Sequence, residues 1–431
     1  MNLALAIRDL SKDLLSVIDR AVSPRTGLIN SLVEEPPSHE ACGIRVVHAV
    51  LSPPTYYRDN RPSFLKTTER GTGAGFSRQR ACWAAIGEAV ERYAASIYWP
   101  DQLIRASAND LGTTAINLHT LIRAGRPEIR LFNPNVVRSW VKGVDLTSGL
   151  TQLVPAAMTY LGFAQSDDDE IISQKDSTGL ACASTFEGAS LAAICEVVER
   201  DVFAANWLLM RKPARLNVGG AFDRLDAAVQ LALVDRRLNL RLFYLAMSFN
   251  VHVVMAVLES RKGIGVVAAS ASPSLVRAVE KATIESLYSW SQASRITQRP
   301  CLASMAEIEV PSDHLRYYLS PERFSIVKEL CNENKAVEMT DLLANEHTNA
   351  TCLDVAMAMK REGFHAAGID LTTADVASLD LSVARVIVPG LQPLIFGPAS
   401  CLAPDARRLN QWRERWGLEE SGLNPHPHPF P

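Results

Sequence analysis

The amino-acid sequence predicts a mixed α/β protein with two related halves. Two observations indicate this fold class: short apolar runs alternate with helix-forming segments, and one helical stretch occurs twice, 108 residues apart (from 88 to 196). The chain has 431 residues, which is long enough for two or three domains with substantial cores. We expect an N-terminal segment over residues 1–70 and a large domain over residues 71–431.

The expected elements follow one another along the chain. A short helix and a strand at 44–50 are followed by a first long helix over 77–98, with Ser77 as N-cap and Pro100 as stop signal. A strand-rich region over 131–161 precedes a second long helix over 185–207, which a capping box at Ser184 introduces. Two strands with a turn at 248–250 fill the apolar stretch 242–258, and the later elements are strands at 263–269, 364–371 and 383–388 and a helix starting at 273–274.

The repeated stretch carries the sequence Glu-x-x-Glu-Arg on both long helices. Residues three apart share a helix face, so Glu88 with Glu91 and Glu196 with Glu199 form two acidic pairs. A single copy would be a solvated face with ion pairs within the helix. The apolar neighbours also repeat at the same spacing, which favours a functional site where the two helices pack side by side.

Four carboxylates in one place repel one another unless cations hold them. Oxygen ligands suit Mg²⁺, which proteins commonly bind through a few carboxylates and the phosphates of a nucleotide. Arg92 and Arg200 directly follow the acidic pairs and would supply positive charge for the same phosphates. Arg200 has an alternative structural role, in which it pairs with a neighbouring acid and holds the helix.

Three motifs together resemble those of the YcaO proteins, over roughly residues 20–431. Residues 73–77 (Gly-Ala-Gly-Phe-Ser) lead to Glu88–Arg92 as in the family's first signature. The second signature is similar to residues 177–181 (Ser-Thr-Gly-Leu-Ala) followed by residues 196–201, and the third to residues 386–394. The resemblance implies a YcaO catalytic domain over residues 71–431, with ATP and Mg²⁺ as cofactors. It assigns Glu88, Glu91, Glu196 and Glu199 to the metal and the nucleotide.

The chain ends in a Pro-x-Pro-x-Pro tail at residues 425–431, a composition that favours polyproline II. Such a tail either frays in solvent or docks in a groove as a pre-ordered strand. Within the YcaO family it resembles the terminus of the azoline-forming branch, which reaches into the active site. We therefore count Pro427, Pro429, Pro431 and His428 as candidate catalytic residues, with a general-base role for His428 as a hypothesis.

The resemblance implies an ATP-dependent cyclodehydratase. In that reaction a Cys, Ser or Thr side chain of a ribosomally made precursor peptide attacks the preceding carbonyl, and ATP phosphorylates the resulting oxygen. Loss of phosphate leaves a thiazoline or an oxazoline. Partners expected from the family are a ThiF-like leader-binding protein and a flavin-dependent azoline dehydrogenase, assembled in a multi-subunit synthetase.

The sequence departs from the family pattern at four positions, where small residues replace polar ones. Ala74 stands in place of the lysine of Gly-Lys-Gly, for which Arg70 or Arg78 would have to compensate, and the others are Ala84, Gly188 and Ala192. The helix starting at 273–274 resembles the family's remaining ATP-side helix. Further nucleotide-binding candidates are Ser184, Arg277 and Glu285.

Composition excludes several other classes. A net charge of −3 gives no basic footprint for nucleic acid, and no apolar stretch predicts a membrane helix or a signal peptide. The eight cysteines lack metal-ligand spacing and predict reduced thiols, hence a cytoplasmic location. His48 and His252 are expected in the core, and the acidic run at 167–170 is interpreted as a solvated loop.

Two alternatives stay open from the residues alone. One is a thioamide-forming YcaO enzyme with a TfuA-type partner, or an amidine-forming member of the family. The other is a non-catalytic nucleotide-binding scaffold or accessory protein, suggested by the four departures from the family pattern.

Overall fold

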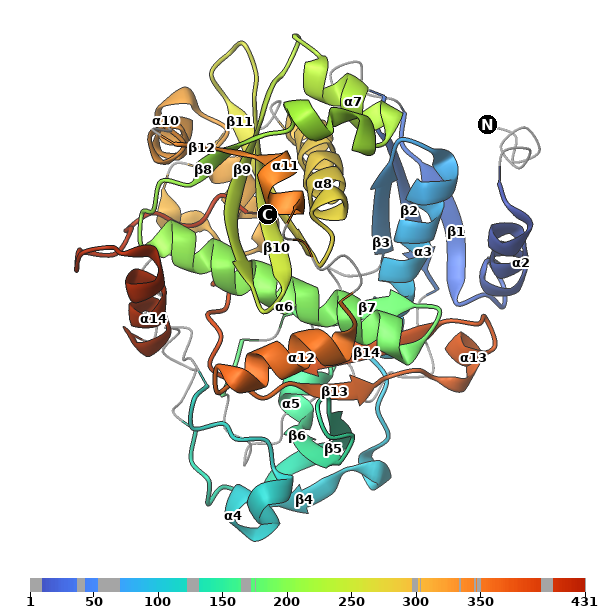
Figure 1. The fold of residues 1–431 in the computed structure, drawn as a ribbon. Helices are drawn as coiled ribbons and strands as arrows, with labels where there is room; N and C mark the ends of the chain where they lie inside the picture. Colours follow the sequence, from blue (N-terminus) through green and yellow to red (C-terminus); the bar gives the residue numbers. More distant parts are fainter. Residues whose placement is uncertain are drawn as a thin grey trace.

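The computed structural model describes residues 10–36, 43–52, 70–121, 132–163, 172–174, 176–296, 301–302, 304–332, 335–344, 346, 350–396 and 406–430. These residues form three β-sheets with helices between and around them, which confirms the predicted mixed α/β class (Figure 1). Within these ranges no helix combines the length and the apolar character that crossing a bilayer requires.

The first sheet is antiparallel and has three strands in chain order: β1 (Ile29–Glu34), β2 (Arg45–Leu51) and β3 (Arg70–Gly75). The second runs β11-β10-β9-β8-β12 and comprises β8 (Ala214–Asn217), β9 (Asn239–Ser248), β10 (Val251–Glu259), β11 (Gly265–Ser272) and β12 (Ala336–Glu338). The third runs β4-β5-β13-β14-β7, with β6 paired to β5, and comprises β4 (Ile104–Ala106), β5 (Arg138–Asp145), β6 (Thr151–Pro155), β7 (Leu180–Ala183), β13 (Ala367–Asp370) and β14 (Ser382–Ile387).

The two helices with the Glu-x-x-Glu-Arg motif both follow edge strands, α3 (Arg78–Ala94) after β3 and α6 (Phe186–Leu208) after β7. The other α-helices are α2 (Lys12–Ala21), α4 (Ala108–Leu111), α5 (Ala156–Thr159), α7 (Ala227–Val234), α8 (Leu275–Ile296), α9 (Pro311–Tyr317), α10 (Pro321–Leu330), α11 (Met339–Leu343), α12 (Cys352–Arg361), α13 (Ala374–Ala377) and α14 (Ala406–Trp416).

Several elements agree with the sequence-based expectations. The stretch 242–258 forms β9 and β10, joined at Phe249 and Asn250, whose φ angles of 52° and 63° fit a tight hairpin. Ser77 and Thr185, 108 residues apart, are the N-caps of α3 and α6, so both copies begin alike. His48 and His252 are buried as expected. The acidic run at 167–170 lies outside the described residues.

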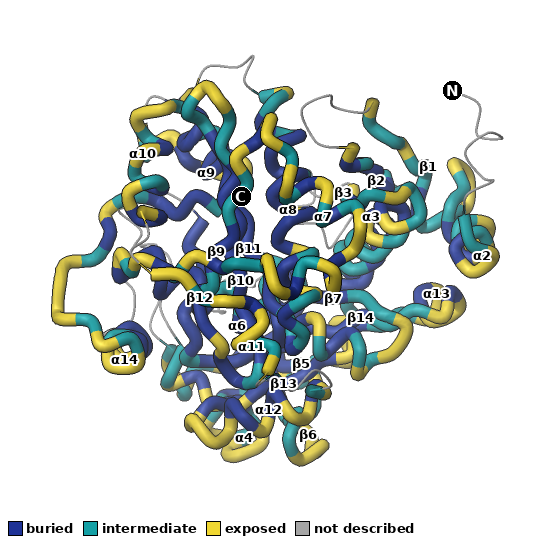
Figure 2. The backbone as a smooth tube through the Cα atoms, turned by 45° about the horizontal axis from the view of Figure 1, so that its top comes forward, coloured by how far each residue is buried: buried dark blue, intermediate teal, exposed yellow. Residues whose placement is uncertain are grey.

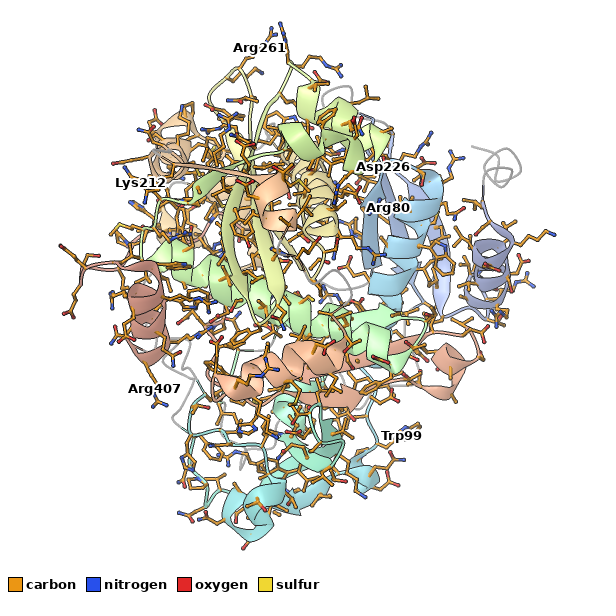
Figure 3. All side chains as sticks on the ribbon, viewed as in Figure 1. Arg80, Trp99, Lys212, Asp226, Arg261 and Arg407 are labelled. Carbon is orange, nitrogen blue, oxygen red and sulfur yellow. The ribbon has the colours of Figure 1, made fainter. Side chains whose placement is uncertain are left out.

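Two predicted helix boundaries were wrong. The first helix was expected to reach residue 98 but ends at Ala94. There the Ser96 N–H donates to the Tyr93 carbonyl at 3.0 Å and the Ile97 N–H to the Ala94 carbonyl at 3.2 Å, so tighter turns replace the α-helical bonds. Trp99, which follows that turn, is 58 % exposed and projects from the surface (Figure 3). The second helix is capped by Thr185 rather than by Ser184, since Thr185 Oγ1 accepts the Gly188 N–H at 3.1 Å.

The helix α3 lies against β3 with almost no space between the two backbones. A Cβ atom built on Gly71 would come within 2.2 Å of the Ala89 nitrogen, and one on Gly73 within 2.1 Å of the Ala81 oxygen. Glycine at alternate strand positions and alanine at every fourth helix position therefore allow this contact. The contact sets where the acidic end of α3 stands relative to the sheet.

The helix α6 occupies the centre of the molecule, between the second and third sheets (Figure 1). It packs against β14 and β7 on one side and against β9, β10 and β11 on the other. A helix covered on several sides has apolar residues all around, and from Val197 to Leu208 nearly every residue is buried (Figure 2). The acidic pair of α6 is therefore carried by an element that cannot shift without repacking two sheets.

A buried ion pair anchors α6 to the C-terminal region. Asp201 is fully buried, and its carboxylate accepts hydrogen bonds from Arg408 Nη2 at 2.5 Å and from the Trp412 indole at 3.1 Å. The backbone N–H of Gln392 donates to the same carboxylate at 2.7 Å. One side chain of α6 thus fixes both α14 and the turn that follows β14.

We expect Asp201→Asn to lower the free energy of unfolding by about 3–5 kcal/mol, because it leaves the Arg408 guanidinium buried without a counter-charge. Urea-induced unfolding measures this loss. The control is Glu362→Gln, which removes an exposed pair with Arg415 (3.8 Å) and should cost less than about 1 kcal/mol. Equal losses in the two variants would contradict a structural role for the Asp201 network.

Candidate active site

Carboxylates from three helices converge at one place. Glu88 and Glu91 come from α3, Glu196 and Glu199 from α6, and Glu285 from α8. Charge repulsion links them in a chain: Glu91 is affected by Glu88 and Glu196, Glu199 by Glu196 and Glu285, and Glu285 by Glu88. The structure therefore brings together all four predicted glutamates and adds Glu285, which the sequence had placed on the neighbouring helix.

Backbone N–H groups orient three of these carboxylates. The Thr72 N–H on β3 donates to Glu88 Oε2 at 2.8 Å, and the Gly179 N–H donates to Glu196 Oε2 at 3.0 Å. The Cys182 N–H on β7 donates to Glu91 Oε1 at 2.8 Å and so connects α3 to the third sheet. Each first glutamate of a pair thus bonds to the segment that precedes its own helix.

A glycine is required where Glu196 is held. Gly179 has a φ of +75°, and a Cβ atom there would lie 2.3 Å from the Val386 oxygen. The Val386 N–H donates to the Gly179 carbonyl at 2.7 Å, so this residue joins β14 to the loop before β7. The second and third sequence motifs therefore meet at Gly179.

The electrostatics of the cluster favour bound positive charge. Desolvation raises the pKa of Glu91 to about 8, and repulsion from Glu88 and Glu196 adds to the effect. Desolvation likewise raises the pKa of Glu199 to about 8, with the Lys281 ammonium opposing and Glu196 adding to it. Hence the folded chain holds protons on carboxylates that an unfolded chain would have lost near pH 4.5.

The signature arginines pair with glutamates of their own helices. Arg92 Nη2 lies 3.1 Å from Glu88 Oε1, and Arg200 Nη2 lies 2.7 Å from Glu196 Oε1. Arg200 Nη1 also donates to Thr178 Oγ1 at 2.5 Å. Of the two roles considered for Arg200, this geometry supports the structural one, although its charge remains next to the cluster.

Sequence reasoning missed two cations near the site. Lys281 is exposed on α8, one helical turn before Glu285, and its charge acts on both Glu199 and Glu285. Arg385 on β14 is only 5 % exposed and interacts electrostatically with Glu196. Spacing contained a usable signal for Lys281, because residues 277, 281 and 285 share one helix face.

The donor set fits Mg²⁺ bound together with a nucleotide. Among the described residues, no three carboxylate, imidazole or thiol side chains are gathered closely enough to hold a metal by themselves. Glu88 and Glu196 keep 34 % and 28 % of their side-chain surface exposed, so ligands can reach them. Mg²⁺ usually combines one or two carboxylates with phosphate oxygens, which this spread of carboxylates allows.

Other predicted site residues lie outside the cluster. Ser184 is exposed, before the start of α6, and lines a separate cavity beside Gly87 and Leu381. Arg277 is exposed in the first turn of α8, two turns before Glu285. Arg78, considered as a substitute for the missing lysine, forms an ion pair with Glu34 at 2.8 Å, and Arg70 is exposed.

The C-terminal tail is docked against the core. The Trp207 indole donates to the His426 carbonyl at 2.9 Å, and the Tyr318 hydroxyl donates to the Pro427 carbonyl at 2.5 Å. His314 Nδ1 donates to the His428 carbonyl at 2.8 Å, and the rings of these two histidines stack with centroids 4.1 Å apart. Pro427, His428 and Pro429 are buried, whereas Pro431 lies outside the described residues.

His428 is held by the protein on both sides. Its Nε2 atom donates to the Ile395 carbonyl at 3.1 Å, and its ring lies edge-on to Phe396. Burial lowers the pKa of His428 well below 6.5, and its neighbour His314 lowers it further. Phe396 in turn lies beneath the Arg200 guanidinium, 5.7 Å from ring centroid to carbon, so the tail reaches the cluster through one aromatic ring.

The buried thiols agree with the expectation of reduced cysteines. The six described cysteines are free, and burial raises the pKa of Cys82 and Cys352 to about 11 and that of Cys182 and Cys195 to about 12. Such thiols are poor nucleophiles and poor metal ligands at neutral pH.

Comparison with solved structures shows the same fold. A heterocyclase in complex with substrate and cofactor superposes with a TM-score of 0.75 at 19 % identity, over 97 % of this chain and 57 % of the heterocyclase chain. This chain therefore spans less than two thirds of that protein. The YcaO protein from Methanopyrus kandleri, bound with AMPPCP and Mg²⁺, gives a TM-score of 0.63 at 24 % identity, over 88 % of this chain and 90 % of its own. A chain of the E. coli microcin synthetase McbBCD complex gives 0.62 at 15 % identity, over 86 % and 91 % of the two chains.

Sequence comparison identifies the family. An uncharacterized protein in the tfuA 3′ region of Rhizobium leguminosarum bv. trifolii is 27 % identical over 357 residues, which cover 75 % of this chain and 77 % of the relative. The family model for the YcaO cyclodehydratases, described as binding ATP and Mg²⁺, matches residues 72–392, which contain the five converging glutamates. The chain belongs to the YcaO family of ATP-dependent, Mg²⁺-binding cyclodehydratases.

Proposed function

We propose that this chain catalyses the ATP-dependent cyclodehydration of Cys, Ser or Thr residues in a ribosomally synthesised precursor peptide. The products are thiazolines or oxazolines on the way to an azole-containing natural product. The observation that carries the proposal is the convergence of Glu88, Glu91, Glu196 and Glu199, two of them with a pKa near 8, in a chain of this family.

The proposed reaction has three steps. The side-chain sulfur or oxygen of the substrate residue attacks the preceding carbonyl carbon and gives up its proton. The former carbonyl oxygen attacks the γ-phosphoryl group of ATP, and ADP leaves. Loss of inorganic phosphate and of the amide proton forms the C=N bond of the ring. The amide oxygen is a poor leaving group, and phosphorylation turns it into a good one.

In this scheme, residues of the chain orient the nucleotide and neutralise the charge of its phosphates. The four signature glutamates would hold Mg²⁺ together with the phosphates of the nucleotide, and Mg²⁺ would neutralise phosphate charge. Lys281, Arg92 and Arg200 stand beside the carboxylates and balance the negative charge that a nucleotide adds. Ser184, Arg277 and Glu285 remain nucleotide-binding candidates, of which Glu285 is the one in the cluster.

We propose that the C-terminal tail holds active-site residues in position. Pro427, Pro429 and His428 are buried next to α6, and Phe396 contacts both the His428 ring and the Arg200 guanidinium. The His428 ring faces the Ile395 carbonyl and has a lowered pKa, so we assign it positioning rather than proton transfer. Pro431 stays a candidate residue of the tail and lies outside the described residues.

The proposed partners follow from the same family. The McbBCD complex supports a synthetase in which other subunits take part. We infer a ThiF-like protein for leader recognition and a flavin-dependent dehydrogenase for oxidation to azoles. The free thiols of the described cysteines are compatible with the cytoplasmic location expected from the sequence.

One observation favours a second function. The Rhizobium relative is encoded in the tfuA 3′ region, and TfuA-type partners belong to the thioamide-forming branch of the family. In that branch external sulfide attacks the activated carbonyl, and sulfur replaces oxygen. The docked Pro-rich tail supports the azoline assignment instead.

We expect Glu196→Gln to weaken the binding of AMPPCP·Mg²⁺ by about tenfold to a hundredfold, because one charged ligand is lost. Isothermal titration calorimetry measures the Kd. Glu187→Gln, at an exposed position in the first turn of the same helix, is the control and should bind as tightly as the unaltered chain. An unchanged Kd in Glu196→Gln would refute the ligand assignment.

The melting temperature of the nucleotide-free protein should fall as pH rises from about 5 to 8. In this window the folded state holds protons on Glu91 and Glu199 that the unfolded chain has released, so raising the pH favours unfolding. Differential scanning fluorimetry tests this, and Glu199→Gln should flatten the slope. AMPPCP·Mg²⁺ should also flatten it, since a bound cation stabilises the ionised carboxylates. A melting temperature that rises through the window would contradict the raised pKa values.

Removal of residues 426–431 should reduce peptide modification about a hundredfold through loss of positioning. The assay is co-expression with the adjacent genes and their candidate precursor peptide, followed by peptide mass. The full chain should remove one water per modified residue, and Pro425→Ala, at an exposed position, is the control. Replacement of oxygen by sulfur would assign the thioamide branch instead, and undiminished modification by the truncated chain would exclude the tail.

A further inference from the structure

Arg200 also lines a second cavity, which does not include any of the signature glutamates. Its volume is about 110 Å³, roughly that of four waters, which suits one small residue better than a long segment. Arg200 and Thr178 form one wall, and the turn after β14 forms another. Arg200 also pairs with Glu196 at 2.7 Å, so one side chain contacts both this cavity and a signature carboxylate.

The cavity contains a buried cation with unused donors. Arg385 is 5 % exposed, and its Nη2 atom donates to the Asp176 carbonyl at 2.9 Å. Its Nε and Nη1 atoms are buried and have no hydrogen-bond partner. The Asp176 carboxylate lies 3.9 Å away and balances part of the charge. A buried guanidinium with two unsatisfied N–H groups is costly unless a ligand accepts from them.

The cavity also contains an unused acceptor. Gln392 is 1 % exposed, and its Nε2 atom donates to the Pro393 carbonyl at 3.2 Å, which fixes the orientation of its amide. The Oε1 atom is therefore an acceptor, and it is buried without a partner. The backbone N–H of Gln392 donates to Asp201, so hydrogen bonds fix both the backbone and the side-chain amide of this residue.

The remaining lining combines polar and apolar groups. Ser173 and Gln174 are polar, and the Gln174 Oε1 atom is a second buried acceptor without a partner. Met158, Val197, Val388 and Leu391 contribute hydrocarbon surface next to the polar groups. A simple anion would satisfy Arg385 but would face the Gln392 oxygen and the Asp176 carboxylate. A peptide group offers both a carbonyl oxygen and an N–H, and it brings a side chain that can fill an apolar wall.

We propose that this cavity is a substrate subsite that binds one residue of the precursor peptide next to the reacting amide. Arg385 donates to a backbone carbonyl of the peptide, and Gln392 accepts a backbone N–H. The apolar wall favours a small, uncharged side chain at that position. This inference rests on the proposed peptide-modifying function.

The test uses N-acetyl-glycyl-cysteine N-methylamide as the probe and the full chain with AMPPCP·Mg²⁺ present. Ligand-observed NMR titration gives the Kd of the probe. Arg385→Gln should weaken binding by about tenfold or more, and Gln392→Met by about threefold or more. Arg241→Gln is the matched control, because Arg241 also has a buried unpaired Nε but lies on β9 and does not line the cavity. It should bind the probe as the unaltered chain does.

Several outcomes would overturn the subsite. Binding that is unchanged in both Arg385→Gln and Gln392→Met would do so, as would absence of probe binding to an unaltered chain that still binds AMPPCP·Mg²⁺. Displacement of the probe by inorganic phosphate in the unaltered chain, but not in Arg385→Gln, would assign the cavity to an anion. Failure of the unaltered chain to bind AMPPCP·Mg²⁺ would instead refute the proposed function. Gln392→Met keeps the inference testable if Arg385→Gln does not fold.

Discussion

The arrangement of this molecule depends on one buried carboxylate. Asp201 lies two residues after Glu199 on α6, and its bonds to Arg408, Trp412 and the Gln392 N–H tie the central helix to α14 and to the turn after β14. The C-terminal tail then returns along the same helix and reaches Trp207. Glu196 and Glu199 are therefore carried by a helix fixed along its length, and the site needs little reorganisation when ligands bind.

The four signature carboxylates fall into two pairs with different environments. Glu88 and Glu196 each accept a backbone N–H and pair with an arginine of the same helix, which keeps them oriented. Glu91 and Glu199 are more strongly desolvated and have a pKa near 8. Ionisation of Glu91 and Glu199 is therefore unfavourable in the folded chain, and a bound cation would stabilise their charged forms. A cluster of this type gains affinity for metal and nucleotide at the expense of stability in their absence.

The sequence predicted elements with strong local signals and missed features that arise from tertiary packing. Repetition revealed Glu88, Glu91, Glu196 and Glu199, and apolar alternation predicted the β9–β10 hairpin. The end of α3 was misplaced because the backbone changes to i→i+3 bonds at Ser96 and Ile97, before Pro100 is reached. Arg385 was missed because its proximity to the cluster comes from strand packing, which no local spacing in β14 reveals. Lys281 shares a helix face with Glu285, and that spacing was overlooked. The N-cap error at Ser184 was one residue, within the usual uncertainty of helix ends.

The contact between β3 and α3 has a consequence for how this site can change over evolution. Most cores can absorb a substitution by rotating neighbouring side chains, but here strand backbone lies on helix backbone and no side chain stands between them. The distance between Thr72 and Glu88 therefore does not depend on how side chains pack in the surrounding core. A substitution that adds a side chain at Gly71 or Gly73 would push α3 away and move Glu88, whereas one at Ala74, on the opposite face of the strand, would add its side chain away from that contact.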